Sequence, residues 1–416
     1  MRLVIEGGHQ LSGDVRVSGS KNASLLCMLA SLLTDHELTL SNVPRVDDIY
    51  GMCSILLHIG KQIDFNQHVL RISGSAKVLS LPHQLASKTR ASDCVLGPLL
   101  AARGVASIAM PGGCILGPRP IDQHLNGLMQ LGASVNANHD LIKATGRLSG
   151  CDIRLTGPRG PTVTGTANLM MAASLANGET TINGASKEPE VVALGDLLNK
   201  MGGDISGLGT DKITIVGVKE LYGARQEVIS DRIEAGTFII AGALIGSRLN
   251  VCDMMVEHLD ALMGMLGSAP PSGCSCCNIN SDYVIMEAHE RSSLDIITSP
   301  YPGFPTDLQS LIATLLTTTG GSIIENVFPE RFAYVNELLK MGVNVHRSGN
   351  RLTIVKSQIK GAKVTATDIR GGAALILAGL AADGITEIDC VHHIDRGYES
   401  IDEKLRLVGA KINRMA

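Results

Sequence analysis

Hydrophobic and polar positions follow one pattern that recurs along the whole chain. A short apolar strand leads through a polar loop into a helix, and an apolar–glycine step then opens a second strand. Clear copies begin at residues 38, 107, 180, 322 and 386, and a degraded copy begins at residue 249. The glycines that end these helices are Gly60, Gly132, Gly202, Gly267, Gly342 and Gly409. A glycine just past a helix favours the left-handed conformation of a C′ residue.

A second pattern lies between these copies, in which a polar loop opens a helix rich in Ala, Gly and Leu. Examples are residues 25–33 and 373–381. Because these helices are apolar on nearly all faces, we expect them to be buried. Each repeat therefore reads as a βαβαββ unit of about 70 residues, longer than the units of small-repeat solenoids. Six copies predict an α/β protein of two domains with three repeats each, with helices inside and sheets outside. An ordinary open α/β sheet is the alternative.

Composition narrows the class of protein. The chain has 416 residues, of which 44% are hydrophobic and 18% charged, which indicates a globular protein of two domains. A net charge of -4 without a basic run argues against nucleic acid as a partner. The first residues lack an apolar signal segment, and no apolar stretch is long enough to span a membrane. The ten cysteines are then reduced thiols, and we expect a cytoplasmic protein.

Polar residues occupy matching positions where the six apolar helices begin. They are Lys21 and Asn22, Arg90, Thr164 and Thr166, Asp231 and Arg232, Asp307, and Asp368 and Arg370. The three aspartates suit N-caps. A lysine or arginine at a helix start opposes the helix dipole, so Lys21 and Arg90 indicate function. Helix N-termini attract anions, which predicts a phosphate or carboxylate ligand between the two domains.

The loop Pro111–Asp122 (PGGCILGPRPID) adds glycines and prolines to a repeat that elsewhere runs straight into its helix. Such a loop can move as a lid, which we place at residues 111–121. Cys114 lies in this loop with Arg119 five residues later, and a nearby cation makes a thiol reactive. A small buried cysteine is the structural alternative.

Nine ordered motifs together resemble the enolpyruvyl transferase family, in the branch that acts on a UDP-amino sugar. They are SGSKNA, LGPLLA, PGGCILGPRPID, EPE, SDRIEAGTF, PYPGFPTDLQ, ERF, ATDIR and HIDRGYE. The resemblance implies a two-domain inside-out α/β barrel, with domains at 21–229 and at 1–20 plus 230–416 and the active site in the cleft between them. It implies transfer of the enolpyruvyl group of phosphoenolpyruvate to the 3′-OH of UDP-N-acetylglucosamine, with release of phosphate. This is the first committed step of peptidoglycan synthesis, hence of cell wall biogenesis, cell shape and cell division, and the target of fosfomycin.

The resemblance also implies roles for individual residues. Cys114 is the proton donor to C3 of phosphoenolpyruvate, and Asp307 is the general base near the 3′-OH. Lys21, Asn22, Arg119, Arg370 and Arg396 bind phosphoenolpyruvate, with Lys21 and Arg396 also catalytic. The UDP sugar is bound by Arg90, Arg119, Pro120, Ile121, Asp122, Gln123, Thr162, Val163, Asp307 and Val327. Asp231 and Asp368 support these residues. No metal, cofactor or protein partner is expected, because cations and helix dipoles supply the electrostatic stabilisation.

Three departures from the family pattern stand out. Gly160 replaces a common lysine, with Arg159 beside it, and Asp93 and Cys94 stand where an aromatic residue is frequent. The loop holding Cys274, Cys276 and Cys277 is a variable surface loop or, less favoured, a metal site. His392 and His393 are expected to position Asp395, Arg396 and Glu399 rather than to act as catalysts.

Two other functions stay open at this point. One is the sibling reaction on shikimate 3-phosphate, against which the cysteine lid argues. The other is a non-catalytic paralogue that binds the nucleotide sugar.

Overall fold

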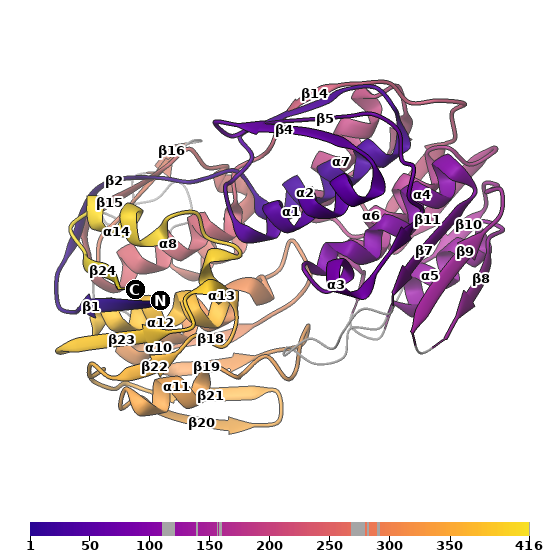
Figure 1. Cartoon of the computed structure of the whole chain (residues 1–416). Helices are drawn as coiled ribbons and strands as arrows, with labels where there is room; N and C mark the ends of the chain where they lie inside the picture. Colours follow the sequence, from indigo (N-terminus) through magenta and orange to yellow (C-terminus); the bar gives the residue numbers. More distant parts are fainter. Residues whose placement is uncertain are drawn as a thin grey trace. The chain divides into compact units, whose positions relative to one another are not determined.

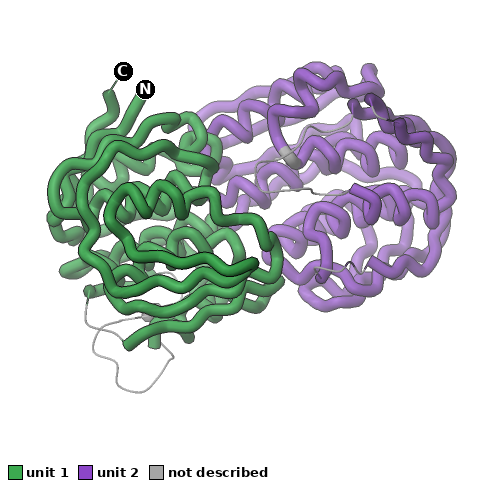
Figure 2. Tube along the Cα trace, turned by 90° about the horizontal axis from the view of Figure 1, so that it is seen from below, with its two compact units in different colours: residues 1–18, 115–117, 230–416 green, residues 19–114, 118–229 purple. Residues whose placement is uncertain are grey.

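The computed structural model describes residues 1–109, 121–138, 140–155, 157, 160–267, 279–280, 283–288 and 292–415, without the side chains of residues 90, 279 and 280. The described residues divide into two compact units (Figures 1 and 2). Unit 1 takes its described residues from 1–18 and 230–416, and unit 2 takes its described residues from 19–114 and 118–229. The chain thus starts in unit 1, passes through unit 2 and returns.

Unit 2 combines helices with three four-stranded sheets among its described residues. The helices are α1 (Lys21–Ala30), α2 (Asp47–Ile59), α3 (His83–Ala86), α4 (Leu96–Arg103), α5 (Asp122–Gln130), α6 (Val163–Ala173) and α7 (Pro189–Lys200), with the 3-10 helices η1 (Ser31–Leu33) and η2 (Arg90–Val95). One sheet has the order β14 (Arg225–Glu227), β3 (Leu38–Ser41), β5 (Val69–Ser73), β4 (Gln62–Asn66). The second is β6 (Ser80–Leu81), β7 (Val105–Ala109), β9 (Leu141–Thr145), β8 (Ser134–Ala137). The third is β10 (Asp152–Arg154), β11 (Glu179–Asn183), β13 (Lys212–Val216), β12 (Asp204–Ser206).

Unit 1 has the same composition of elements among its described residues. Its helices are α8 (Arg232–Ile245), α9 (Asp260–Met265), α10 (Gln309–Thr319), α11 (Val335–Lys340), α12 (Ile369–Ala381), α13 (His392–Asp395) and α14 (Ile401–Leu407), with η3 (Val256–Leu259) and η4 (Thr306–Leu308). One sheet has the order β2 (Leu11–Arg16), β15 (Gly246–Cys252), β17 (Tyr283–Met286), β16 (Ile279–Asn280). The second is β18 (Leu294–Ile297), β19 (Gly321–Ile324), β21 (Arg351–Val355), β20 (Asn344–Ser348). The third is β22 (Lys363–Thr365), β23 (Ile385–Asp389), β1 (Arg2–Glu6), β24 (Lys411–Met415).

All six of these sheets share one pairing pattern. The first two strands of each order given above pair in parallel, and the remaining two pairs are antiparallel. Alternate residues are buried along strands such as β21 (Arg351–Val355), where Leu352 and Ile354 face the interior. One face of each such strand therefore packs on helices, as period-2 patterning requires.

The apolar helices are buried as their sequence predicted. In α12 every residue from Arg370 to Leu380 is buried, and α8 is buried from Ile233 to Leu244. In unit 1, α8, α10 and α12 pack against one another, and in unit 2, α6 packs against α4 and α7. Because these helices have no polar face to expose, burial on all sides is the arrangement that removes their apolar surface from water.

The marker glycines have the left-handed backbone expected of C′ residues. Their φ angles lie between 78° at Gly267 and 113° at Gly60. A side chain at this conformation is strained, so glycine is the residue that ends these helices without steric strain.

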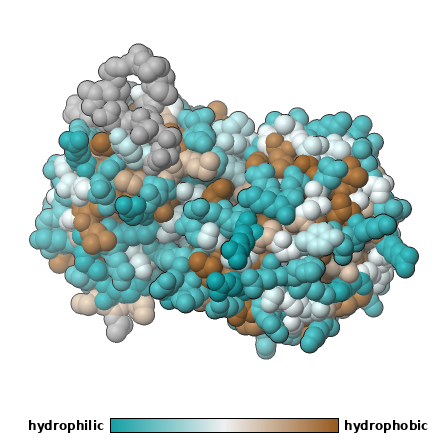
Figure 3. Space-filling model, turned by 90° about the horizontal axis from the view of Figure 1, so that it is seen from above, coloured by the Kyte–Doolittle hydropathy of each residue, from teal (hydrophilic) through white to brown (hydrophobic). Residues whose placement is uncertain are grey.

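The outer surface is mainly polar on the face drawn in Figure 3, where hydrophobic residues are interspersed among hydrophilic ones. In the part of the chain that the structure describes, no helix is both long enough and apolar enough to cross a membrane.

Candidate active site

Asp307 lies between two arginines in unit 1. Arg331 Nη1 donates a hydrogen bond of 2.6 Å to Asp307 Oδ1, and Arg370 Nη2 donates one of 3.3 Å to Oδ2. The side chains of Arg331 and Arg370 are only 6% and 3% exposed, against 28% for Asp307. Two buried guanidinium groups favour the charged carboxylate, which is the form that a base needs. Asp307 lies inside η4, whose N-cap is Pro305, and Leu308 is the N-cap of α10, so Asp307 is not an N-cap as Asp231 and Asp368 are.

Arg370 stands in the first turn of α12, buried beside Tyr398 and Asp307. Burial alone would lower the pKa of Arg370, but Tyr398, Asp307 and Asp231 outweigh it, and the pKa is raised. Its guanidinium carbon also lies 5.2 Å from the centre of the Tyr398 ring. Arg370 is therefore a fixed cation within the helix start, a position at which the helix dipole also favours anions.

Asp231 and Asp368 are N-caps of α8 and α12. Asp231 Oδ1 accepts from the backbone N–H groups of Ile233 and Glu234, and Asp368 Oδ1 accepts from those of Arg370 and Gly371. These contacts fix the first turns that carry the functional groups. That both aspartates also support the substrate-binding residues stays a prediction.

Val327, a predicted contact of the sugar nucleotide, lies in a turn built on the buried Glu325. The backbone N–H groups of Val327 and Phe328 each donate 2.8 Å hydrogen bonds to Glu325 Oε1. The Glu325 side chain is fully buried, so these bonds hold the turn in one conformation.

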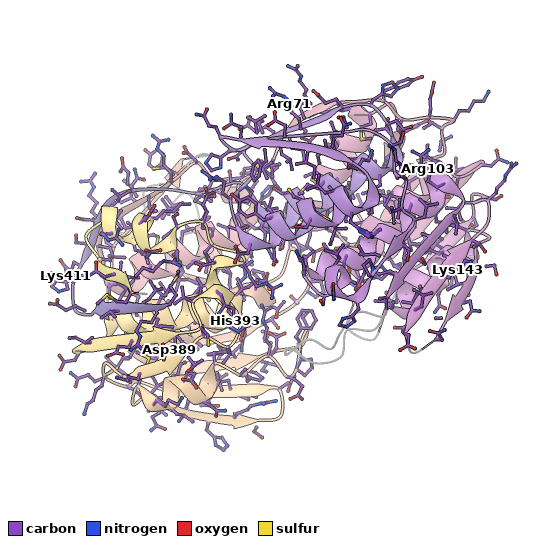
Figure 4. All side chains as sticks on the ribbon, viewed as in Figure 1. Arg71, Arg103, Lys143, Asp389, His393 and Lys411 are labelled. Carbon is purple, nitrogen blue, oxygen red and sulfur yellow. The ribbon has the colours of Figure 1, made fainter. Side chains whose placement is uncertain are left out.

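Arg396 directly follows α13 and is half-buried. The segment around it is anchored, because Tyr398 OH lies 2.9 Å from Thr237 Oγ1 and Arg414 binds Asp395. The rings of His392 and His393 lie 4.2 Å apart, and Figure 4 labels His393. Burial lowers the pKa of His393, and His392 and Arg396 lower it further. A neutral His393 avoids a second positive charge beside Arg396.

Unit 2 places Lys21 and Asn22 in the first turn of α1. Ser20, not Lys21, caps this helix by accepting a hydrogen bond from the Ala23 backbone N–H. Lys21 is 8% exposed, and its Nζ lies 3.2 Å from Oδ2 of Asp48, which is 4% exposed. Burying an ammonium group is costly without a partner, so Asp48 stabilises the buried cation at the start of α1.

The residues predicted for the nucleotide end come from two neighbouring helix starts in unit 2. Ile121, Asp122 and Gln123 open α5, whereas Thr162 caps α6 through the Gly165 backbone N–H and is followed by Val163. Helices α5 and α6 pack against each other. A Cβ built at Gly157 would meet Gln123 Nε2 at 1.9 Å, so Gln123 lies directly against the segment before α6.

Several predicted residues lie outside the described part of the chain. They are Cys114, Arg119 and Pro120, together with the side chain of Arg90. Gly160, where the family pattern favours lysine, has a φ of 89°. The left-handed conformation there suits glycine and strains any other residue.

Within the described ranges, no group of three or more His, Cys, Asp or Glu side chains is arranged to hold a metal ion. Cys274, Cys276 and Cys277 lie outside those ranges.

Sequence reasoning missed four residues that the structure places beside predicted ones. Arg331, Glu325, Asp48 and Arg414 all pair with or support a predicted site residue. Arg331 had a signal, because it lies in the ERF motif. Glu325, Asp48 and Arg414 are polar residues with partners far away along the chain. The local sequence pattern therefore does not reveal their roles.

The fold places buried cations and a carboxylate at helix starts, an arrangement whose dipoles and charges suit anionic ligands. A family model described as EPSP synthase (3-phosphoshikimate 1-carboxyvinyltransferase) matches residues 5–405. The chain belongs to this family of enolpyruvyl transferases.

Two curated relatives resemble this chain over its full length. A protein of Methylacidiphilum infernorum is 42% identical over 419 residues, covering 100% of this chain and 99% of that protein. A protein of Desulfatibacillum aliphaticivorans is 44% identical over 420 residues, with the same coverage. Both are named UDP-N-acetylglucosamine 1-carboxyvinyltransferase.

Solved structures agree on the fold. An enolpyruvyl transferase of Streptomyces tendae matches with a TM-score of 0.87 at 23% identity, covering 99% of this chain and 98% of that one. The EPSP synthase of Acinetobacter baumannii matches with a TM-score of 0.76 at 17% identity, covering 100% of both chains. These matches show an α/β enolpyruvyl transferase fold.

Proposed function

We propose that this protein transfers the enolpyruvyl group of phosphoenolpyruvate to the 3′-OH of UDP-N-acetylglucosamine and releases phosphate. The observation that carries the proposal is full-length identity of 42% and 44% to relatives named for this reaction. The site residues support it, because a carboxylate and several cations stand at the starts of buried helices. The same proposal places the protein in the cytoplasm and in peptidoglycan synthesis.

The chemistry divides into an addition and an elimination. In the addition, the 3′-oxygen forms a bond to C2 of phosphoenolpyruvate, its proton passes to Asp307, and C3 gains a proton, for which we propose Cys114. In the elimination, the C2–O bond to phosphate breaks, C3 returns a proton to the Cys114 thiolate, phosphate leaves with the proton that Asp307 had taken, and the enolpyruvyl ether forms. Lys21, Arg119, Arg370 and Arg396 hold the phosphate and carboxylate charges. The guanidinium groups of the three arginines suit such anions, because each can make two parallel hydrogen bonds to them.

The finer architecture is part of the proposal. We propose that units 1 and 2 are the two domains of the family fold, each an inside-out α/β barrel of three βαβαββ repeats. The six sheets with one pairing pattern and the buried helices support it. We further propose that the predicted residues of both units act on the same pair of substrates.

Phosphate release from phosphoenolpyruvate tests the function directly. One reaction contains UDP-N-acetylglucosamine and a second contains shikimate 3-phosphate. We expect release only with the UDP sugar, and its loss in Cys114→Ala. Release only with shikimate 3-phosphate would assign the sibling reaction, and no release with either would favour a non-catalytic paralogue.

Alkylation by an epoxide phosphonate such as fosfomycin tests the assignment of Cys114. We expect a single covalent adduct in the intact-mass spectrum when UDP-N-acetylglucosamine is present, and none in Cys114→Ala. An unmodified wild-type spectrum contradicts the assignment.

A further inference from the structure

Glu325 is a fully buried carboxylate that accepts hydrogen bonds from Thr298, from Thr306 and from the turn at residues 327–328 in unit 1. Oε1 accepts from the Thr298 hydroxyl at 2.8 Å and from the backbone N–H groups of Val327 and Phe328 at 2.8 Å each. Oε2 accepts from the hydroxyl of Thr306 at 2.9 Å. Thr306 immediately precedes Asp307, so one carboxylate joins the Val327 turn to the turn that carries the proposed base.

The direction of the Thr306 hydroxyl follows from its two neighbours. Arg331 Nη1 lies 3.2 Å from Thr306 Oγ1 and, as a guanidinium nitrogen, is only a donor. The Thr306 proton must therefore point to Glu325, and the Thr306 oxygen accepts from Arg331. An ionised carboxylate is the partner that imposes this direction, because it is only an acceptor.

Arg331 uses the same nitrogen for Asp307. Its Nη1 donates to Asp307 Oδ1 at 2.6 Å while it also donates to Thr306. A hydrogen-bond chain therefore runs from Glu325 through Thr306 and Arg331 to Asp307. Its members Glu325 and Arg331 are 0% and 5% exposed, so water does not compete readily for these bonds.

We propose that Glu325 is a positioning residue for the transfer reaction, which sets the orientation of Arg331 on Asp307 through the hydroxyl of Thr306. The proposal rests on the proposed function, in which Asp307 is the base. Glu325 itself does not touch the substrates. Its effect is to hold the base in the geometry that proton removal from the 3′-OH requires, where a displacement of about 1 Å can cost roughly a hundredfold in rate.

The isosteric change Glu325→Gln tests the direction of the chain. The amide oxygen replaces Oε1, because three donors face that position, and the NH2 group then faces Thr306. The Thr306 oxygen accepts from this new donor, its own proton turns toward Arg331, and the bond from Arg331 is lost. We expect kcat to fall roughly 10- to 100-fold, with the KM for phosphoenolpyruvate within about twofold of wild type.

Thr306 supplies a second test that leaves the buried carboxylate in place. Thr306→Val removes the hydroxyl at constant shape and is expected to lower kcat as Glu325→Gln does, whereas Thr306→Ser keeps the hydroxyl and restores kcat. Because both changes break one chain, the double variant Glu325→Gln/Thr306→Val should be no slower than the slower single variant. The control is Glu330→Gln, since Glu330 is exposed and pairs with Arg347 at 2.9 Å, away from Asp307.

Crystal structures of Glu325→Gln and Thr306→Val give a result that does not depend on activity. We expect the Arg331 guanidinium to leave Asp307 in both. Arg331 retained on Asp307, or equal kcat for Thr306→Val, Thr306→Ser and wild type, overturns the inference. A wild type that releases no phosphate with UDP-N-acetylglucosamine would instead overturn the proposed function, while the crystal structures would still decide the role of Glu325.

Discussion

Arg414 donates hydrogen bonds of 2.7 and 2.9 Å to the two carboxylate oxygens of Asp395, the residue before Arg396. A third bond of 2.8 Å joins Arg414 to Asp402. The last strand, β24, therefore holds the segment that presents Arg396. The carboxylates of Asp395 and Asp402 raise the pKa of Arg414, although its partial burial acts in the opposite direction. Arg414 therefore stays positively charged.

Replacing Arg414 with lysine should weaken the binding of phosphoenolpyruvate. Lysine keeps the charge but cannot make the two parallel bonds that fix Asp395. We expect the KM for phosphoenolpyruvate to rise about tenfold, with the KM for UDP-N-acetylglucosamine unchanged. Steady-state kinetics with each substrate varied in turn measures both values. Arg406→Lys is the matched control, because Arg406 pairs with Asp402 at 3.4 Å but has no bond to Asp395. Equal behaviour of the two variants would contradict the prediction.

Lys61 makes the folding stability depend on pH. Its ammonium group is buried and donates to the carbonyl oxygens of Thr34 and Gly74 at 2.7 and 2.6 Å. Burial lowers its pKa from 10.5 to about 8, with Asp35 opposing this effect and Arg103, labelled in Figure 4, adding to it. Between these two values the unfolded chain binds more protons than the folded chain, so stability rises with pH in that window.

Urea unfolding from pH 8 to pH 10.5 measures this effect. The wild type should gain up to about 3 kcal/mol over this range relative to Lys61→Met. Lys77→Met serves as the control, because Lys77 is exposed, and it should keep the wild-type slope. A wild type whose pH dependence matches that of Lys61→Met argues against the shifted pKa.

Gly97 permits the close approach of α4 to α6. A Cβ at this position would lie 2.3 Å from the backbone oxygen of Asn168 and 2.4 Å from Asn168 Oδ1. Gly97→Ala should therefore destabilise the protein by about 1–3 kcal/mol, because neither oxygen can move freely. Gly264 is also helical, but nothing lies within 4 Å of a Cβ there, so Gly264→Ala should gain about 0.5–1 kcal/mol. Thermal melting of both variants tests the contrast, and equal shifts would contradict it.

The buried His124 is held as one tautomer. The Gly97 N–H donates to Asn168 Oδ1 at 2.8 Å, so the Asn168 amide nitrogen faces His124 Nδ1 at 3.2 Å. Nδ1 is therefore the acceptor, and Nε2 carries the proton toward Thr164 Oγ1 at 3.2 Å. Nitrogen NMR of ¹⁵N-histidine-labelled protein should show an unprotonated Nδ1 and a protonated Nε2 for His124. The signal is assigned by its absence in His124→Gln, and a protonated Nδ1 would refute the assignment.

Sequence alone determined the features that depend on local pattern and backbone conformation. The apolar helices were predicted to be buried, and α8 and α12 are; the marker glycines were predicted to be left-handed, and all six are. Capping by Asp231 and Asp368 was likewise predicted from residue type alone. Such features follow from the side chain and its immediate neighbours along the chain, which the sequence displays directly.

Tertiary structure decided which polar groups meet. Asp307 looked like a cap but binds Arg331, 24 residues along the chain, and Arg370, 63 residues along it. Contacts between separate elements likewise determine the partners of Glu325, Asp48 and Arg414. A buried charge takes the partner that packing brings within hydrogen-bond distance, and its desolvation makes that partner obligatory. The local pattern cannot encode that choice, because it arises only when distant segments share one interior.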